Sequence, residues 1–147
     1  MIIKTATDDE LEDIRTIDSM TLGSNRRRDF LTEAVKAGRC LVADVGGKVA
    51  GFGILEQTFY GQGFISLLIV HPDNRRKGVA TALIRRMESA CPTKKLFTST
   101  NESNIAAQKT YESLDFVRSG YIENLDEDDP EIIYFKHLGD AAQEGAP

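Results

Sequence analysis

The stretch that decides the fold leads from an apolar segment into a helix, and it reads Val70-His71-Pro72-Asp73-Asn74-Arg75-Arg76-Lys77-Gly78-Val79-Ala80-Thr81. Pro72 ends the preceding strand, because proline cannot donate to a strand ladder. Three cations follow, and Gly78 then opens an amphipathic helix. The free N–H groups and the positive dipole end of a helix N-terminus favour an anion, which would also neutralise these cations. The pattern therefore indicates a phosphate site, and the competing interpretation is a solvated loop.

Short apolar runs and helical patterns alternate outward from this stretch. Phe64–Val70 is apolar except for Ser66, which predicts a central strand buried on both faces. Gly46-Gly47 predicts a tight hairpin, and Thr7 with Glu10 forms a capping box. The other expected strands are Met1–Ala6, Cys40–Val45, Val49–Phe59, Leu96–Thr100, Phe116–Ile122 and Ile132–His137. The expected helices are one that begins after Thr7, then Ser24–Ala37, Val79–Ala90 and Asn104–Leu114.

The order of these elements predicts an α/β protein (α+β mixed sheet). Antiparallel hairpins come first, and a right-handed β-α-β crossover joins Phe64–Val70 to Leu96–Thr100. We therefore expect a mixed central sheet flanked by helices on both faces. Residues 1–138 are expected to form a single domain, and residues 139–147 a flexible C-terminal tail.

Composition narrows the class of protein further. The 147 residues, 41% of them hydrophobic, suffice for one domain with its own core. The 18 Lys and Arg against 23 Asp and Glu give a formal net charge of −5, which argues against a nucleic-acid partner. Cys40 and Cys91 fit neither a metal site nor a needed disulfide. With no secretory signal and no membrane-spanning run, we expect a cytoplasmic protein without a membrane partner, either a monomer or a homodimer.

Two blocks of sequence resemble those of a known family. Arg75-Arg76-Lys77-Gly78-Val79-Ala80 resembles the Arg/Gln-x-x-Gly-x-Gly/Ala motif of the GNAT superfamily of N-acetyltransferases. The segment from Asn104 through Tyr111 to Phe116 resembles the family's second block, with Asp115 at a position that is usually glycine. Within the family, the chain is similar to the ribosomal-protein N-terminal alanine acetyltransferases. The resemblance implies a GNAT-like domain with acetyl-CoA as its cosubstrate.

The resemblance also implies where the cosubstrate binds. The strand end would pair through its backbone with the pantetheine arm, and an N–H near Ile69 and Val70 would face the thioester carbonyl. Asn104 would contact the amide region of the cofactor. The residues implied for the pantetheine arm are Leu68, Ile69 and Val70, and those implied for the pyrophosphate are Arg75, Arg76, Lys77, Gly78, Val79, Ala80 and Thr81.

Tyr111 is the implied general acid, which would return a proton to the leaving thiolate. A phenol with a pKa of about 10 and a thiol with a pKa of about 8.5 are close enough for proton transfer. The competing interpretation of Tyr111 is a packing residue on an amphipathic helix. Asp115 tolerates the left-handed conformation, so its departure from the family pattern is expected to be harmless.

The general base is left open by the sequence. In the alanine acetyltransferases a Glu lies five positions before the Asn, but here that residue is Ser99, which is no comparable base. Glu56 and Glu123 are the alternatives, and each also fits an exposed strand charge. His71 and His137 are not assigned to catalysis. The acidic run Asp126–Glu131 would favour a cationic acceptor if it overhangs the acceptor groove.

These observations predict an enzyme that transfers an acetyl group from acetyl-CoA directly to a primary amine, without a covalent intermediate or a metal. The acceptor could be a small amine, a polyamine, or a protein or peptide amine. The alternative is a non-catalytic acyl-CoA-binding regulatory module on the same fold. A nucleotide-binding or phosphate-binding domain that uses Arg75–Lys77 is a third interpretation.

Overall fold

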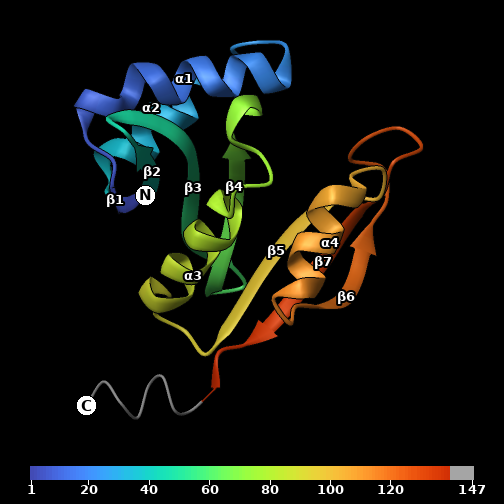
Figure 1. The fold of residues 1–147 in the computed structure, drawn as a ribbon. Coiled ribbons are helices and arrows are strands. Elements are labelled where there is room, and N and C mark those ends of the chain that lie inside the picture. Colours follow the sequence, from blue (N-terminus) through green and yellow to red (C-terminus); the bar gives the residue numbers. More distant parts are fainter. Residues whose placement is uncertain (140–147) are drawn as a thin grey trace. The chain divides into compact units, whose positions relative to one another are not determined.

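A computed structural model describes residues 1–139, so the expected tail lies, apart from Gly139, outside the described residues. No helix among them is long and apolar enough to cross a membrane. Figure 1 shows the elements, which in chain order are β1 (Ile2–Thr5), α1 (Asp8–Leu22), α2 (Arg28–Lys36), β2 (Cys40–Val45), β3 (Lys48–Phe59), β4 (Gln62–Val70), the 3-10 turn η1 (Pro72–Asn74), α3 (Val79–Ala90), β5 (Lys95–Asn101), α4 (Ile105–Ser113), β6 (Val117–Ile122) and β7 (Glu131–His137).

The strands form one mixed sheet in the order β1-β2-β3-β4-β5-β7-β6. Strands β4 and β5 pair in parallel over Gly63–Ile65 and Leu96–Thr98, as expected for strands joined through a helix. The pairs β1–β2, β2–β3, β5–β7 and β7–β6 are antiparallel. The expected mixed α/β sheet with β4 as a central strand is therefore confirmed.

The chain divides into two compact units. The first comprises Met1–Leu55 and Leu67–Met87, and the second comprises Glu56–Ser66 together with the chain from Glu88 onward. Strands β3 and β4 therefore contribute residues to both units.

In the first unit, helices α1 and α2 cover one face of the sheet. Their apolar side chains form a core with β2 and β3, and burying each of the larger ones, such as Ile14 or Phe52, stabilises the fold by about 1.5–3 kcal/mol. Leu67 and Ile69 of β4 pack against this core. The buried members are Ala6, Ile14, Ile17, Leu31, Ala34, Val35, Cys40, Val42, Phe52 and Ile54.

Helix α3 packs on the opposite face of the same unit, where β3 presents two glycines. A Cβ atom on Gly51 would lie 2.9 Å from the carbonyl oxygen of Ile69 and 3.0 Å from Cγ1 of Val79. A Cβ atom on Gly53 would lie 2.8 Å from Cε of Met87. Because successive strand residues point to opposite faces, these glycines face α3 while Phe52 and Ile54 face the core. In this unit helices thus flank both faces, as expected.

In the second unit, α4 lies along one face of β5 and β7 (Figure 1). The ring of Tyr111 lies 5.5 Å from that of Phe116 and 5.6 Å from that of Tyr134, between centroids. Thr98 of β5 is fully buried on this face. Tyr111 therefore has the packing role that its helical spacing allowed, in addition to any chemical one.

The other face of this unit's strands carries a row of aromatic rings. The ring centroid of Phe97 lies 5.0 Å from that of Phe59 and 5.2 Å from that of Phe135, both in tilted arrangements, and Phe59 stacks on Phe64 at 4.8 Å. Phe64, Phe97 and Phe135 occupy matching positions in the ladders, which places their side chains on one face.

Local signals correspond closely to local structure. Thr7 and Glu10 form the expected capping box, with the N–H of Thr7 donating to Glu10 Oε1 at 2.8 Å. Gly46 and Gly47 both have positive φ in the β2–β3 turn, and Asp115 has a φ of 71°. These expectations are confirmed.

Two expectations need correction. Helix α2 begins at Arg28 instead of Ser24, because the chain bends at Ser24 and turns at Arg26 and Arg27, and Arg27, whose side chain binds Asp18, stands at the N-cap. Strand β4 is buried only at Gly63 and Ile65, and its other residues are half-buried. Burial on both faces was therefore the wrong expectation, because β4 continues beyond its ladder with β5.

Candidate active site

The loop between β4 and α3 ends in a helix N-terminus with free donors. Arg76 and Gly78 have φ values of 61° and 81°, which turn the chain sharply into the helix. Ala82 N–H donates to the carbonyl oxygen of Gly78 at 3.0 Å. The N–H groups before Ala82 in the first turn therefore have no intrahelical acceptor, and they are the donors that an anion would occupy.

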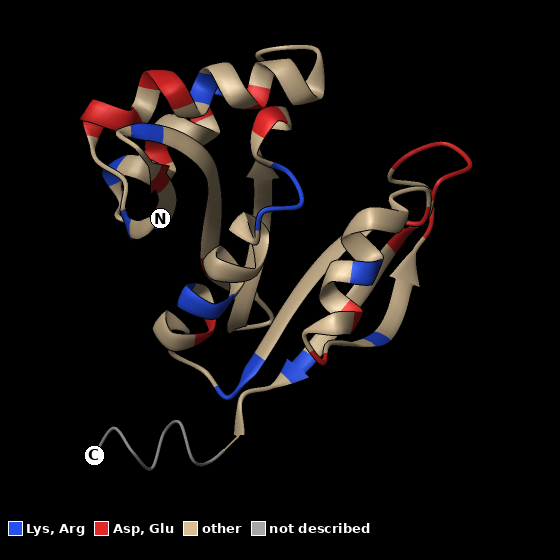
Figure 2. Ribbon diagram, in the orientation of Figure 1, with Lys and Arg blue, Asp and Glu red and all other residues tan. Residues whose placement is uncertain are grey.

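The side chains of this loop would add positive charge around an anion held by the backbone. Arg75, Arg76 and Lys77 are exposed, and Figure 2 shows them as a blue segment that enters α3. Among the described residues no carboxylate in the first turn of α3 opposes them. Val79 is only 2% exposed and its side chain packs toward Gly51, so Val79 can offer a ligand only its backbone. Ala80 is half-buried and Thr81 is exposed.

The end of β4 is the second predicted contact region. Its ladder with β5 covers Gly63–Ile65, and β4 then continues to Val70. Ile69 packs against the core of the first unit, while Leu68 lies on the side of Gly53. The side chains of this segment are thus used in packing, which leaves the backbone as the part available to a ligand.

Asn104 caps helix α4. Its Oδ1 accepts a hydrogen bond from Ala107 N–H at 3.1 Å, which satisfies one of the free donors of the helix start. The residue is exposed, so its side-chain NH₂ group can still donate to a ligand.

Tyr111 is buried in the second unit, with 4% of its surface exposed. Thr98 Oγ1 lies 3.0 Å from the carbonyl oxygen of Ile65 and 3.3 Å from the hydroxyl oxygen of Tyr111. A threonine has one hydroxyl proton, so when it binds the carbonyl, the Tyr111 hydroxyl is free to donate. Burial raises the pKa of Tyr111, the hydrogen bond to Thr98 opposes this, and the charge of Glu131 adds to the rise. Tyr111 therefore stays protonated at neutral pH.

A hydrogen-bonded carboxylate lies beside Ser99, the position at which this chain lacks the Glu of the alanine acetyltransferases. Ser99 Oγ donates to Glu131 Oε2 at 2.7 Å, and both residues are half-buried. Ser99 lies on β5 opposite Ile133 of β7, so Glu131 reaches it from the next position on the same face. Sequence reasoning noted Glu131 only as the last residue of an acidic run. The register that joins it to Ser99 had no signal in the sequence.

The two carboxylates that the sequence suggested as bases, Glu56 and Glu123, are held less firmly than Glu131. Glu56 accepts a hydrogen bond from Thr58 at 3.4 Å, and Glu123 is exposed beyond the end of β6. His71 Nδ1 accepts from Asp73 N–H at 3.0 Å, and His137 Nδ1 accepts from Gly139 N–H at 3.0 Å. Both histidines thus bond backbone.

The cysteines are both free thiols. Cys40 is fully buried, and burial raises the pKa of its thiol to about 12. Such a thiol is not a nucleophile at neutral pH.

Part of the acidic run has a structural role. Asp129 accepts hydrogen bonds from the N–H and the hydroxyl of Ser103, at 3.0 and 2.6 Å. Asp126 accepts from Asn101 Nδ2 at 2.8 Å. These two carboxylates hold the β6–β7 loop to the β5–α4 connection. Glu127 and Asp128 are exposed in the same loop, which Figure 2 shows in red.

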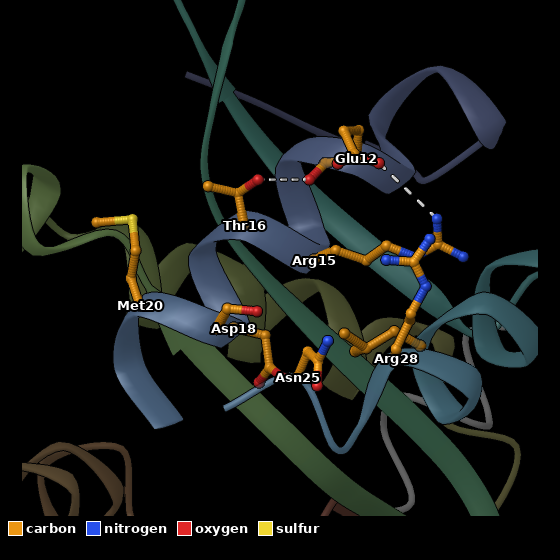
Figure 3. A pocket seen from close by; sticks show the side chains of 9 residues that line it. Glu12, Arg15, Thr16, Asp18, Met20, Asn25 and Arg28 are labelled. Carbon is orange, nitrogen blue, oxygen red and sulfur yellow. Dashed lines mark hydrogen bonds and ion pairs between the residues drawn. The ribbon is translucent and has the colours of Figure 1, made fainter. Parts of the chain in front are cut away.

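A pocket of about 280 Å³ opens between α1 and α2 in the first unit (Figure 3). Its lining carries charges of both signs, from Glu12 and Asp18 and from Arg15 and Arg28. Asp18, which is 1% exposed, is held by Arg27 through a contact of 2.7 Å between Oδ1 and Nη2. The sequence did not indicate this pocket, because its lining mixes polar and apolar side chains from two helices and the turn between them.

Comparison with known proteins identifies the family. The model of the acetyltransferase (GNAT) family matches residues 5–116, and the chain belongs to that family. The GNAT-family acetyltransferase of Bacillus cereus ATCC 10987 is 40% identical, over 92% of this chain and 96% of that one, with a TM-score of 0.89. No curated protein sequence matches the chain.

More distant structures share the fold. The ribosomal-protein-S18-alanine N-acetyltransferase of Escherichia coli is 20% identical, over 94% of each chain, with a TM-score of 0.77. The structure of yncA from Salmonella typhimurium with its cofactor acetyl-CoA is 16% identical, also over 94% of each chain and with a TM-score of 0.77. The protein is thus a GNAT acetyltransferase, and acetyl-CoA is its acetyl donor, as the two sequence blocks implied.

Proposed function

We propose that the enzyme transfers the acetyl group of acetyl-CoA directly to a primary amine. The observation that carries the proposal is the start of α3, where free N–H donors follow three exposed cations and two left-handed residues. A pyrophosphate is the anionic part of coenzyme A, and it satisfies both the donors and the cations. In this proposal the backbone of Gly78–Thr81 binds the pyrophosphate, and Arg75–Lys77 add charge around it.

The pantetheine arm is assigned to the backbone of Leu68–Val70. An extended ligand can add to a strand through main-chain hydrogen bonds, and β4 continues beyond its ladder with β5. An N–H near Ile69 and Val70 would donate to the thioester oxygen as negative charge develops there. The side-chain NH₂ of Asn104 is assigned to the amide region of the cofactor, because its Oδ1 is already engaged as a helix cap.

Tyr111 is assigned as the general acid. Its raised pKa keeps the phenol protonated until the thiolate leaves. The free thiols need no role, because the amine attacks the thioester directly. A buried thiol such as that of Cys40, with a pKa of about 12, could not form an acyl intermediate at neutral pH.

The acceptor is assigned as a primary amine of a small amine, a polyamine or a peptide. The exposed Glu127 and Asp128 would favour a cationic acceptor, whereas Asp126 and Asp129 are used within the fold. Incubating the enzyme with acetyl-CoA and either spermidine or a peptide with a free N-terminal alanine should release CoA thiol in proportion to the amide formed. Tight acetyl-CoA binding without amine-dependent thiol release would contradict a primary-amine acceptor and favour the acyl-CoA-binding module.

The cofactor site is tested with a matched pair of glycine substitutions. Gly78 and Gly47 have φ values of 81° and 83°, and a Cβ atom at either would meet nothing within 4 Å. Alanine at either position should therefore cost a similar amount of stability, about 1 kcal/mol. Only Gly78→Ala should also weaken acetyl-CoA binding, by about tenfold, because it places a methyl group where the phosphate approaches.

Isothermal titration with acetyl-CoA and urea unfolding separate the two effects. Equal acetyl-CoA affinity in Gly78→Ala and Gly47→Ala would contradict the proposal that the start of α3 binds the pyrophosphate. ATP, titrated in parallel, should bind far more weakly than acetyl-CoA, because it lacks the pantetheine arm that β4 holds. Equal affinity for ATP would favour a nucleotide-binding domain.

A further inference from the structure

The hydrogen bond from Ser99 fixes the carboxylate of Glu131, which the sequence did not single out as a base. The 2.7 Å hydrogen bond from Ser99 Oγ holds one oxygen, Oε2. A carboxylate has further acceptor sites, so its other oxygen can accept a proton. Both residues are half-buried, which shields the carboxylate partly from water without closing it off.

The surroundings of Glu131 also differ from those of an ordinary surface charge. Its neighbours on the same face of the ladder are Ile133 of β7, Ile122, which pairs with it on β6, and the polar Asn101, which pairs with it on β5. The charge of Glu131 is close enough to Tyr111 to contribute to the raised pKa of that phenol. In the second unit the carboxylate of Glu131, held by Ser99, is therefore near enough to the Tyr111 phenol for its charge to act on it.

We propose that Glu131 is the general base that takes a proton from the acceptor ammonium, directly or through one water molecule. The inference rests on the proposed function and deepens it. At pH 7 an amine with a pKa of about 10.4 is almost wholly protonated, and freeing its lone pair costs roughly 4–5 kcal/mol without help. A held carboxylate on the partly apolar face is the group that can supply this help.

The step balances in protons and bonds. Glu131 takes one proton from the ammonium, and the neutral nitrogen attacks the thioester carbon. The new C–N bond forms, the C–S bond breaks, and Tyr111 gives its proton to the leaving thiolate. The second nitrogen proton returns to the Tyr111 phenolate through solvent, and Glu131 releases its proton to solvent. The products are the amide, free CoA thiol and one proton.

Glu131 is favoured over the carboxylates that the sequence suggested. Glu123 is exposed, and the longer contact of Glu56, 3.4 Å to Thr58, comes from a neighbour on its own strand. Among the carboxylates of residues 1–139, only that of Glu131 is held by Ser99, the residue at the position where the alanine acetyltransferases carry their Glu. Strand β7 therefore provides, through Glu131, the carboxylate that β5 lacks at Ser99.

The test compares Glu131→Gln with Glu123→Gln in the full-length protein. The variant Glu131→Gln should lower kcat/KM for spermidine or the alanine peptide by about 100-fold at pH 7, with unchanged acetyl-CoA affinity. For spermidine the deficit should shrink as the pH rises to 9, by up to about tenfold per pH unit, because a neutral amine needs no base. For the alanine peptide, whose α-amine has a pKa of about 8, it should shrink mainly between pH 7 and 8. Glu123→Gln should leave both quantities unchanged.

Two further measurements separate a base from a merely structural residue. Ser99→Ala should lower kcat/KM severalfold, because the carboxylate is no longer held, and should leave the melting temperature close to that of the wild type. Hydrolysis of acetyl-CoA without amine should also fall in Glu131→Gln, since the same carboxylate would take the proton from water.

The outcomes are distinct. Wild-type kcat/KM and an unchanged pH profile in Glu131→Gln would overturn the role of Glu131 and leave amine acetylation standing. A uniform loss at every pH, together with weaker acetyl-CoA binding, would also overturn it and indicate a structural role. Acetyl-CoA hydrolysis that depends on Glu131, without acetylation of either amine, would support the base and overturn the primary-amine acceptor.

Discussion

The hydroxyl oxygen of Tyr111 lies 3.3 Å from Thr98 Oγ1 inside the second unit, where helix α4 meets strand β5. Thr98 is itself within 3.0 Å of the carbonyl oxygen of Ile65. The phenol is thus oriented by a side chain that a backbone carbonyl holds in place. A substitution that removes the hydroxyl of Tyr111 but keeps its ring therefore separates proton donation from packing.

Tyr111→Phe should lower kcat by about 100-fold with little change in acetyl-CoA affinity, because the proton donor is lost and the ring remains. Steady-state kinetics with acetyl-CoA and spermidine or the alanine peptide measures the effect. The matched control is Tyr134→Phe, since the Tyr134 ring lies 5.6 Å from Tyr111 and its hydroxyl donates to Glu112 at 2.9 Å. Equal turnover in the two variants would leave Tyr111 with packing alone.

The glycines under α3 should differ in their tolerance of a methyl group. Gly51→Ala should lower the free energy of unfolding by about 1–3 kcal/mol, because its Cβ would meet the backbone oxygen of Ile69. Gly53→Ala should cost less, since its Cβ would meet the flexible end of Met87. Urea denaturation of both variants gives the comparison, and a larger loss in Gly53→Ala would contradict this account of the packing.

The ion pair of Asp18 should matter to stability. Asp18 is 1% exposed, and Asp18→Asn should reduce the free energy of unfolding by about 1.5–3 kcal/mol, because the charge-assisted hydrogen bonds from Arg27 are lost. Glu12→Gln is the control: the Glu12 side chain is 80% exposed, and its 3.8 Å contact with Arg15 should be worth less than about 1 kcal/mol. Thermal unfolding of both proteins checks the prediction, and similar losses would refute it.

Stability should fall in alkaline solution. Burial raises the pKa of Cys40 to about 12 and also raises the pKa of Tyr111, so the folded state keeps protons that the unfolded state loses. The stability that these groups contribute is complete below their unfolded pKa values and is lost as pH rises toward the folded ones. For Cys40 the window runs from about pH 9 to 12, with a slope of at most about 1.4 kcal/mol per pH unit.

Urea midpoints measured at pH 7, 9 and 10.5 test this dependence. Cys40→Ala should be less stable at pH 7, because it leaves a small cavity, and should lose less further stability as the pH rises. A wild-type midpoint that does not change across this range would show that the protons of these groups are not linked to folding.

The parts of the fold that could be predicted from the sequence depend on local signals. Helix α3 was expected over Val79–Ala90 and is found there, because Gly78 and Pro92 both act on the chain next to them. The β2–β3 turn at Gly46 and Gly47 was equally clear, since only positive φ closes it. The family motif at the start of α3 could be recognised for the same reason, because its residues are consecutive in the chain.

The parts that could not be predicted depend on contacts between distant residues. Glu131 meets Ser99 only through the register of β5 against β7, and a shift of one residue would move it to the other face. Gly51 and Gly53 look like ordinary strand glycines until Val79 and Met87 are packed against them. The half-burial of β4 likewise depends on where its ladder with β5 ends.

The alternation along β5 has a consequence for how protons would move during a turnover. Thr98 and Ser99 are neighbours in the chain, yet one contacts the phenol on the α4 side and the other holds the carboxylate on the opposite side. In the proposed mechanism the phenol and the carboxylate would therefore approach the reacting groups from opposite faces of β5, and each would exchange protons with the substrates and not with the other.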